Sequence, residues 1–420
     1  MINSGDTAWV LASGALVLFM TPGLAIFYGG MVRAKSVLNM MMMSFAAIGV
    51  TTIIWVLYGY SLAFGPDSGQ GLIGNFSQVG LTKTINETVG APGHQIPTLA
   101  FAMFQLTFAI VTVALVSGAI ADRAKYGSWV LFVAVWVTLV YIPIAHWAFA
   151  SQQGHGGWIV DRLGALDFAG GTVVEINSGA AALALAIVLG KRNGFRRDPM
   201  RPHNMPLVLL GAGMLWFGWF GFNAGSALSA GSLAATAMIN TQVATAAAAM
   251  SWVVYEKIRE GKSTTLGVAS GAIAGAVAIT PACGFVTPLG ALAIGLIAGP
   301  LASFAVSRKY KLGYDDSLDV VGVHGIGGIL GMLSIGFLAT TAANKAGGLG
   351  LINNGSFSLL GKQFIAIVVT AVFSFSMTYI IAKVISKTIG FRVYHEEELE
   401  GLDTTFHAES AYDLTGSGNR

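Results

Sequence analysis

The chain has 420 residues, of which 54% are hydrophobic and only 10% are charged. A soluble globular domain carries roughly 25% charged residues, so this composition excludes an ordinary soluble protein and is typical of a membrane protein. The net charge of +3 lacks the basic excess that nucleic-acid binding requires, and the single cysteine excludes an intrachain disulfide and a cysteine-based metal site.

Apolar runs long enough to cross a bilayer recur along the whole chain. A run of roughly 18 or more apolar residues predicts a membrane-spanning helix. Such runs lie at about 8–31, 37–64, 96–120, 127–149, 166–190, 206–229, 233–256, 264–282, 287–307, 318–339 and 361–388. Asp6 precedes the first run and no basic residue does, so we expect a span there and not a signal peptide. The sequence therefore predicts an all-helical polytopic membrane protein with eleven transmembrane helices.

Basic residues are concentrated on one side of the predicted membrane. Of the 23 lysines and arginines, 19 lie in alternate loops, beginning with the loop after the first span, or near and beyond the end of the last span. The other side holds Lys83, Arg162, Lys345 and Lys362. Because loops rich in Lys and Arg stay in the cytoplasm, we predict that the N-terminus lies outside and the C-terminal end lies in the cytoplasm.

The spans divide into two predicted repeats. The fifth and tenth spans each begin with a glycine-rich segment led by an aspartate, at Asp167 and Asp319. This echo suggests repeat halves at about 8–190 and 206–339, followed by an extra helix at 361–388. Because each half has an odd number of spans, the second half must be inserted upside down, which is the 5+5 inverted-repeat architecture of many transporters.

The same two spans contain the most informative residues, Glu175 and His324. At 1.5 Å per residue, Glu175 lies roughly 13 Å into its span from the outside and His324 roughly 9–12 Å into its span from the inside. Both therefore fall near the middle of a hydrocarbon core that is ~30 Å thick. Ionisable groups at that depth cost a few kcal/mol each and usually face a partner or a pathway. We hypothesise that the two residues meet and share protons as one unit along a conduction route; the alternative is that each is bonded to backbone and merely tolerated.

Other candidate residues have simpler alternative explanations. Asp167 stands at the first turn of the fifth span, where a carboxylate caps the helix and also favours a cation nearby. Phe101, Phe104 and Phe108 share one helical face of the third span, and the sixth span carries an aromatic cluster over residues 216–222. Most of these rings are expected to pack in the core, but rings that face a pore can bind a small cation, at roughly 0.5–2 kcal/mol each.

No enzyme signature is present in the sequence. The chain has no zinc-protease, nucleophile-elbow or P-loop motif, so it offers no catalytic residue and no metal ligand set. We therefore predict that the protein is not an enzyme and carries no cofactor.

Five stretches of the chain resemble the ammonium transporter (Amt/Mep/Rh) family, and most closely its bacterial Amt branch. They are Tyr141–His146, Asp167–Thr172, Gly218–Ser226, Thr280–Gly284 and Val321–Gly325. The similarity covers nearly the whole chain, from Pro22 to the tail. It implies eleven helices in a 5+5 inverted repeat, a homotrimer with one pathway per subunit, and ammonium or ammonia as the transported species.

The resemblance also implies roles for particular residues. Phe108 and Phe222 correspond to a stacked phenyl gate. Ser226 corresponds to the outer ammonium site, Asp167 to its electrostatic support, and Trp219 lies in the same segment. The paired pore histidines of the family fall at Glu175 and His324.

Two positions depart from the family pattern. Glu175 replaces the first pore histidine, as an acid does in one fungal branch of the family. Phe149 stands where many Amt proteins place a tryptophan, and phenylalanine binds cations more weakly through its ring.

These features define an expected route. Ammonium is caught outside by Phe108, Phe149 and Ser226 and loses a proton near the gate, because a bare cation in a dry pore costs many kcal/mol. Ammonia then passes Glu175 and His324. The alternative, from another functional class, is an ammonium sensor with the same site and little flux.

The C-terminal tail is expected to be separate from the membrane domain. We predict a transmembrane domain over residues 1–390 and a cytoplasmic tail over 391–420. The tail is acidic over Glu396–Glu400, which by composition alone is typical of a solvated segment without fixed structure. The segment Gly401–Tyr412 resembles the regulatory C-terminus of the family, which in bacteria works beside PII-type signal proteins at the cytoplasmic exit.

Overall fold

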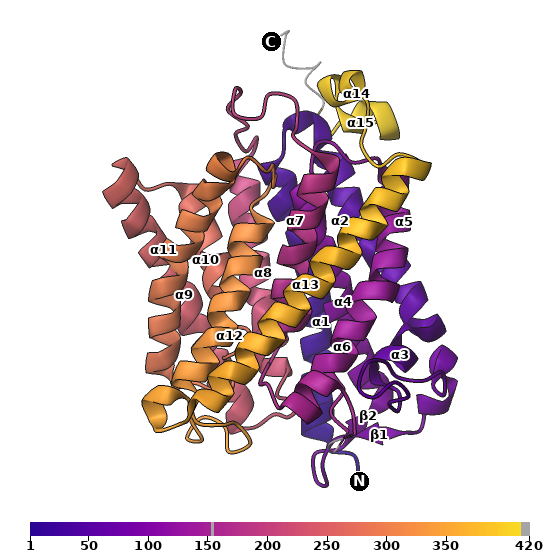
Figure 1. Cartoon of the computed structure of the whole chain (residues 1–420), viewed down its shortest axis with the longest axis vertical. Helices are drawn as coiled ribbons and strands as arrows, with labels where there is room; N and C mark the ends of the chain where they lie inside the picture. Colours follow the sequence, from indigo (N-terminus) through magenta and orange to yellow (C-terminus); the bar gives the residue numbers. More distant parts are fainter. Residues whose placement is uncertain (153–154, 413–420) are drawn as a thin grey trace.

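The computed structural model of the chain describes residues 1–152 and 155–412. Within these residues the regular structure is helical apart from one two-stranded hairpin, and the long helices form a single bundle (Figure 1). Ten helices are long and apolar enough to cross a membrane, and one further apolar helix is shorter. The predicted all-helical polytopic membrane fold is therefore confirmed.

The helices of the bundle follow the order of the predicted spans. They are α1 (Ser4–Met31), α2 (Val37–Ile54), α3 (Tyr60–Phe64), α4 (Thr98–Val116), α5 (Tyr126–Trp136), α6 (Ile142–Phe149), α7 (Asn177–Leu189), α8 (Met205–Gly225), α9 (Ser232–Glu260), α10 (Thr265–Ile279), α11 (Pro288–Leu312), α12 (Ile326–Leu338) and α13 (Phe357–Thr388). Turns of π-helix extend or join several of them, at η2 (Trp55–Gly59), η5 (Val137–Tyr141), η7 (Gly171–Ile176) and η8 (Val321–Gly325).

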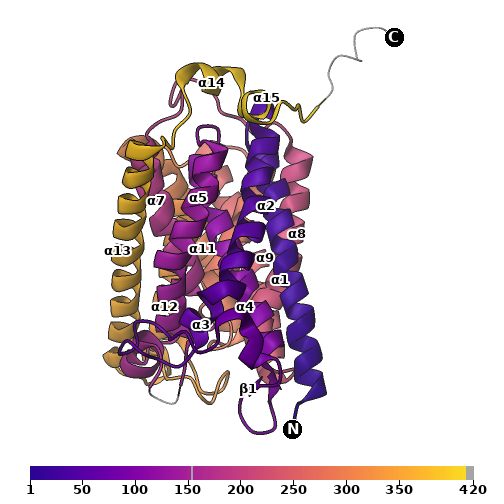
Figure 2. The ribbon, with the colours of Figure 1, turned by 90° about the vertical axis from the view of Figure 1, so that its right-hand side faces the viewer.

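Shorter elements lie at the two ends of the bundle. The N-terminal end carries the hairpin of β1 (Thr88–Val89) and β2 (Ile96–Pro97), and the opposite end carries α14 (His395–Glu400) and α15 (Leu402–His407) (Figures 1 and 2). The remaining short helical turns are η1 (Ala34–Ser36), η3 (Val79–Thr84), η4 (Ser117–Ile120), η6 (Trp158–Leu163) and η9 (Leu351–Asn353). The N-terminus and the tail helices thus lie at opposite ends of the molecule.

Glycines determine how closely α1 and α8 pack. A Cβ atom at Gly211 would lie 2.4 Å from the backbone nitrogen of Phe27, and one at Gly218 would lie 2.8 Å from the carbonyl oxygen of Leu16. A Cβ at Gly225 would lie 2.5 Å from the Cβ of Ser13. Since side chains cannot fit at these contacts, the two backbones approach closely, as small residues permit in membrane helices.

Two predicted spans differ from the observed helices for local reasons. The eighth span was predicted at 264–282, but α10 ends at Ile279. Pro281 lies just beyond it, and proline has no backbone N–H and disfavours helix in the preceding residue. The fifth span was predicted from residue 166, but its helix begins at Gly171, because residues 164–170 form the loop that carries Asp167.

The C-terminal tail contradicts the prediction made from its composition. Residues 395–407 form two short helices that pack on the end of the bundle near α2 (Figure 2). The Asp403 carboxylate is buried and accepts hydrogen bonds from the backbone nitrogens of Leu38 and Asn39, at 3.0 and 2.8 Å. His407 Nε2 lies 3.0 Å from the Asn39 side-chain oxygen. The expectation of a solvated segment is therefore wrong for this part of the tail, because its acids cap the start of another helix.

A buried carboxylate, Glu398, joins the tail to the loops beneath it. It accepts hydrogen bonds from Arg392 Nη2 at 2.9 Å and from the backbone nitrogen of Asn193 at 2.6 Å. Arg33 approaches the same carboxylate at 3.9 Å and binds Asp122 at 3.1 Å. The charge of Glu398, within the acidic run that suggested disorder, is therefore partly neutralised by two arginines, Arg392 and Arg33.

Candidate functional site

The fifth and tenth spans, which we also call the two half-spans, cross in the middle of the bundle at a pair of glycines. The π-helical turns η7 and η8 begin the fifth and tenth spans, which cross the bundle in opposite directions. A Cβ atom at Gly179 would lie only 2.3 Å from the Cα of Gly325, so the two backbones are in direct contact. A Cβ at Gly328 would lie 2.7 Å from the Cβ of Glu175. These glycines let the two spans bring their ionisable residues together.

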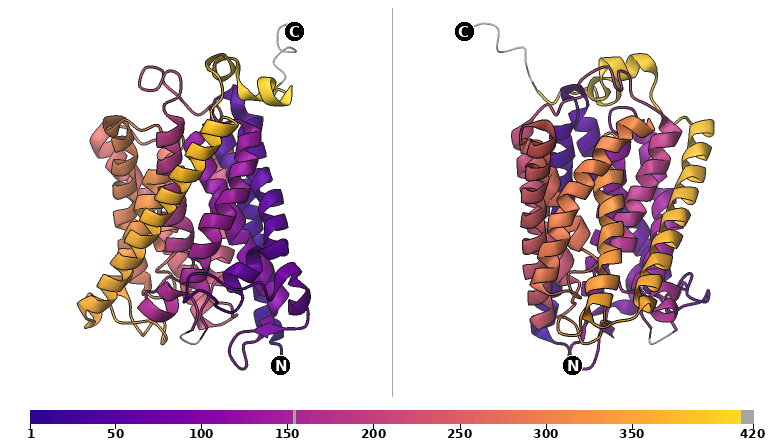
Figure 3. Two further views of the ribbon diagram at one scale, coloured as in Figure 1. Left: turned by 45° about the vertical axis from the view of Figure 1, so that its right-hand side comes forward. Right: turned by 60° about the vertical axis from the view of Figure 1, so that its left-hand side comes forward.

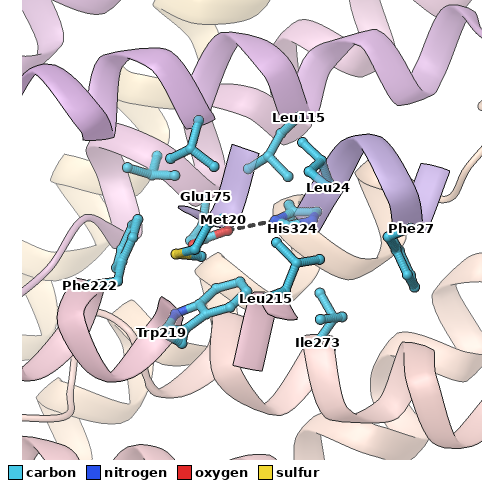
Figure 4. Close-up of a pocket in the computed structure, with 12 residues that line it drawn as sticks. Met20, Leu24, Phe27, Leu115, Glu175, Leu215, Trp219, Phe222, Ile273 and His324 are labelled. Atoms are coloured by element: carbon cyan, nitrogen blue, oxygen red, sulfur yellow. Dashed lines mark hydrogen bonds and ion pairs between the residues drawn. The ribbon is translucent and has the colours of Figure 1, made fainter. Parts of the chain in front are cut away.

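Glu175 and His324 meet at this crossing. The Glu175 Oε2 atom and His324 Nδ1 lie 2.7 Å apart, and both side chains are buried (Figure 4). The second carboxylate oxygen, Oε1, has no hydrogen-bond partner within the described part of the chain. The contact that the sequence suggested is present, and a carboxylate bound to an imidazole can exchange protons with a molecule in the adjoining cavity.

The pair lines a narrow apolar cavity, which we call the lumen. Its free volume is about 10 Å³, near the lower limit for holding one water molecule. Figure 4 shows Phe222 towards one end, Phe27 towards the other, and the Glu175–His324 pair between them. The remaining lining residues are Met20, Leu24, Val111, Leu115, Val174, Leu215, Trp219 and Ile273. The pair therefore provides the only ionisable side chains among the residues that line this cavity.

Two stacked rings lie at the end of the lumen that Phe222 lines. Phe108 and Phe222 have ring centroids 4.2 Å apart and an interplanar angle of 30°. Phe149 packs edge-on against Phe108, with centroids 6.4 Å apart, and lines a second cavity of about 470 Å³ near the hairpin. We call this second space the outer cavity. Phe108 thus separates Phe149 from Phe222, in the order expected for an outer site followed by a gate.

Ser226 lies one helical turn beyond Phe222. Its hydroxyl donates a hydrogen bond to the Phe222 carbonyl oxygen at 2.8 Å. Since the hydroxyl proton is committed to its own helix, the lone pairs of the oxygen stay free to accept a hydrogen bond from a donor such as ammonium.

Asp167 acts as a cap in the structure. Its carboxylate accepts hydrogen bonds from the backbone nitrogens of Gly170, Gly171 and Thr172, at 2.7–2.8 Å, and from the Thr172 hydroxyl. These contacts fix the start of η7, four residues before Glu175. Among the described residues, the Asp167 carboxylate forms its hydrogen bonds with Gly170, Gly171 and Thr172 and none with Ser226, so any effect on a cation there acts through the field of the carboxylate and the helix end.

Trp219 lies on the inner side of the gate. Its ring lines the lumen with Glu175 and His324, and its Nε1–H donates to Thr280 Oγ1 at 2.9 Å. It does not line the outer cavity, where sequence similarity grouped it with the ammonium-binding candidates. The structure therefore places it in the wall of the lumen, beside Phe222.

A second capping aspartate was missed from the sequence. Asp316 Oδ2 accepts a hydrogen bond from the backbone nitrogen of Val321 at 2.7 Å, at the start of η8. It precedes His324 by eight residues, as Asp167 precedes Glu175. Sequence comparison had paired Asp167 with Asp319, but Asp319 binds Lys309 instead. The shared spacing of eight residues is the sequence signal that identifies Asp316 as the counterpart of Asp167.

Asp316 lies in a buried, charged environment on the tail side of the bundle. Its carbonyl oxygen accepts a hydrogen bond from Lys309 Nζ at 2.8 Å, and its Oδ1 atom has no partner among the described residues. Burial raises the pKa of Asp316 to about 6, and Asp319 adds to this effect while Lys309 opposes it. The loop that starts the tenth span therefore holds a carboxyl group that titrates close to neutral pH.

Comparison with known proteins assigns the chain to a family. Residues 8–412 match the family described as the Ammonium Transporter Family. An ammonium transporter of Mycobacterium bovis is 53% identical over 434 aligned residues, covering 98% of this chain and 91% of the relative. The crystal structure of Saccharomyces cerevisiae Mep2 matches with a TM-score of 0.85 and 34% identity, covering 94% of this chain and 88% of that one. A structure described as "Sensor Amt Protein" matches with a TM-score of 0.86 and 30% identity, covering 95% and 97%.

The crossing of the two half-spans predicts that alanine is harmful at Gly179 and tolerated at Gly325, although the two glycines are in contact. Gly179→Ala places a methyl group against the Gly325 backbone, so we expect little folded protein and less than about a tenth of native transport, since overpacking costs typically 1–3 kcal/mol. In Gly325→Ala the new Cβ has 3.4 Å to its nearest neighbour, so this matched variant should fold and transport. Size-exclusion profiles and flux in liposomes check both variants, and equal behaviour would contradict the crossing.

Asp316 predicts a defined pH dependence of stability. Because its pKa is raised in the folded chain, its contribution favours folding below pH 4 and is lost as the pH rises through about 6. Between pH 4.5 and 7, the free energy of unfolding of the native chain should therefore fall by on the order of 1–2 kcal/mol relative to that of Asp316→Asn. Thermal unfolding in detergent measures this difference, and parallel curves for the two proteins would show that Asp316 does not titrate in that range.

Proposed function

This chain belongs to the ammonium transporter family, whose members are transporters and not enzymes, and we propose the route by which it carries ammonium across the membrane. Ammonium is recruited in the outer cavity, loses a proton at the stacked phenylalanines, and crosses the lumen as ammonia. The proton passes separately along Glu175 and His324. The observation that carries this proposal is the ionisable pair enclosed in an apolar lumen behind two stacked rings.

We propose that recruitment takes place where Phe149, which lines the outer cavity, meets Phe108, with Ser226 one helical turn from Phe222. The ring faces attract a small cation, and the Ser226 oxygen accepts one of its hydrogen bonds. Asp167 adds negative field from the start of η7, although its oxygens are occupied by backbone donors. These four residues thus attract the cation through ring faces, one hydroxyl oxygen and the field of a capped carboxylate.

Deprotonation follows from the dryness of the lumen. Its walls are leucines, valines, methionine and aromatic rings, and its volume is about 10 Å³. An unpaired cation in such surroundings costs many kcal/mol, whereas neutral ammonia keeps one hydrogen-bond acceptor and three donors at much lower cost. The phenyl stack of Phe108 and Phe222 marks the point where the cation would lose its remaining water.

The Glu175–His324 pair provides the proton path and is the only ionisable pair among the described residues that line the lumen. We propose that Glu175 stands at the position of the first pore histidine of the family. The unpartnered Oε1 atom of Glu175 can take a proton from the outer side, and the imidazole can pass one towards the tail side. A carboxylate also attracts whole cations more strongly than an imidazole does, so exclusion of potassium should be weaker than with two histidines.

The same family membership supports an assembly and an orientation. We propose a homotrimer in the cell membrane, with one pathway per subunit, the N-terminus outside and the tail in the cytoplasm. The distribution of Lys and Arg supports this orientation. We propose a transmembrane domain over 1–390, with two inverted repeats and one extra helix, and a tail over 391–420 that works beside a PII-type protein. Residues 413–420 of that tail lie outside the described residues.

Flux in liposomes separates the transporter from the sensor alternative. The fold does not decide between them, because the chain resembles both Mep2 and a structure described as a sensor. We expect the purified chain, with no partner protein, to move ammonium into liposomes at rates well above those of empty liposomes. Gly325→Ala, which is expected to fold and transport, serves as the positive control for reconstitution. Binding of ammonium without flux would favour the sensor.

Competition by potassium tests whether the Glu175 carboxylate weakens the selectivity for ammonium. If Glu175 attracts cations, potassium should inhibit ammonium current in the native chain more than in Glu175→His, by about threefold in half-inhibitory concentration, as expected for a difference below 1 kcal/mol. Both proteins are measured in the same lipid and at the same pH. Equal inhibition would remove Glu175 as the cause of looser selectivity.

A further inference from the structure

A third cavity lies behind the crossing of the fifth and tenth spans, on the side of the bundle that α13 crosses. Its volume is about 380 Å³, and its walls come from the end of η7 and from α7, η8, α12 and α13. Figure 1 and Figure 3 show α13 running diagonally across this side of the bundle. The walls include Ala180, Leu183, Ile329 and Phe375, and apolar surface dominates them. We call this cavity the α13 groove.

The α13 groove backs directly on the proton pair. Gly179 and Gly325, which form the backbone contact between the two half-spans, are both part of its wall. Ile176 also lines it and is the residue after Glu175. The groove therefore reaches the depth of the pair, near the middle of the membrane.

The framework of the groove is fixed by polar contacts of α13 with the fifth span. Gln363 is buried and exchanges two hydrogen bonds with the backbone of Leu166, at 2.8 and 2.7 Å. Ser374 donates to the Asn177 carbonyl oxygen at 2.8 Å. These buried bonds fix the position of α13 beside the fifth span, and the groove is the space that the side chains between them leave unfilled.

A row of side chains leads from the groove to the tail end of α13. Phe375 lines the groove and stacks on Tyr379, with ring centroids 6.2 Å apart. Lys383 Nζ lies 5.5 Å from the centre of the Tyr379 ring. The three residues are spaced four apart, so they share one face of the helix. No carboxylate of the described residues forms a salt bridge with Lys383.

The length of this row matches one leaflet of a bilayer. The eight helical steps from Phe375 to Lys383 rise ~12 Å along the helix, and half of a typical hydrocarbon core is ~15 Å. An acyl chain that fills the groove at mid-depth would therefore place its headgroup at the level of Lys383. Tyr379 lies between them, where a ring with a polar end is favoured near the membrane surface.

We propose that the α13 groove and Lys383 form a binding site for one phospholipid with an anionic headgroup. Its acyl chain fills the groove behind Gly179 and Gly325, and its phosphate lies at Lys383. The acyl chain covers the α13 side of the crossing, on the other side of the backbone from Glu175 and His324. A second copy of the chain fits this place less well, because the exposed residues near the end of α13 include Lys387 and the loops on that side are basic, so two copies would repel each other.

The test measures lipid retained by the purified, full-length protein with native mass spectrometry, after addition of phosphatidylglycerol or phosphatidylcholine. We expect phosphatidylglycerol to be retained preferentially and Lys383→Gln to weaken its binding by about fivefold, the effect of one cation at a membrane surface. Lys362→Gln, at the other end of α13, is the matched control and should bind as the native chain does. Equal weakening by both variants, or no preference for phosphatidylglycerol, would overturn the headgroup site.

Two further variants test the groove itself. Ala180→Phe puts a ring into the groove from α7 and should reduce retention of both lipids, whereas Val368→Phe, on the exposed face of α13 outside the groove, should not. Unchanged lipid retention in Ala180→Phe would overturn the acyl-chain site. Ser376→Cys, at the groove edge, tests whether a second copy of the chain occupies the groove. Disulfide-linked dimers of this variant in membranes would show that another subunit lies there and would contradict the proposal. The native Cys283 is buried and gives no background in this assay.

Discussion

The backbone contact between Gly179 and Gly325 is the constraint on which the rest of the site depends. With no side chain at either residue, two half-spans cross within van der Waals distance, and Glu175 and His324 meet at 2.7 Å in the adjoining wall of the lumen. A carboxylate placed alone at this depth would be neutralised at a large cost, but the imidazole provides it with a partner. The small residues therefore determine the charge chemistry of the pathway, although they touch no substrate.

The two ends of the crossing are fixed in the same way by capping carboxylates. Asp167 binds the first backbone nitrogens of η7, and Asp316 binds the start of η8 from the opposite side of the membrane. The neighbour of Asp316, Asp315, accepts a double hydrogen bond from Arg192 at 2.8 and 3.0 Å, and Arg192 also approaches Asp122. Through Asp122 and Arg33 the same group of charges reaches Glu398 of the tail. The position of His324 is thus part of a continuous set of contacts that includes the docked tail.

Much of this arrangement follows from simple sequence rules. Long apolar runs predicted the spans, and the depth of Glu175 and His324 in spans of opposite direction predicted their contact. The rest could not be predicted in that way. The residues of the lumen wall, such as Met20, Leu24 and Phe27, are apolar residues in an already apolar helix, so no contrast in the sequence marks the face that lines the lumen. Asp316 was overlooked because Asp319 stands closer to the glycine-rich turn. The acidic tail was misjudged because composition does not show that Asp403 caps another helix.

The most direct test of the account is the current produced by an ammonium concentration jump on proteoliposomes, compared between the native chain and Glu175→Gln. Glutamine keeps the size of the side chain and a hydrogen bond to His324 but cannot carry a proton. The account predicts a native current that falls by at least about tenfold in the variant, as for the loss of a proton-transfer group, while the variant remains folded. An equal current in the two proteins would contradict the claim that Glu175 and His324 form the proton path.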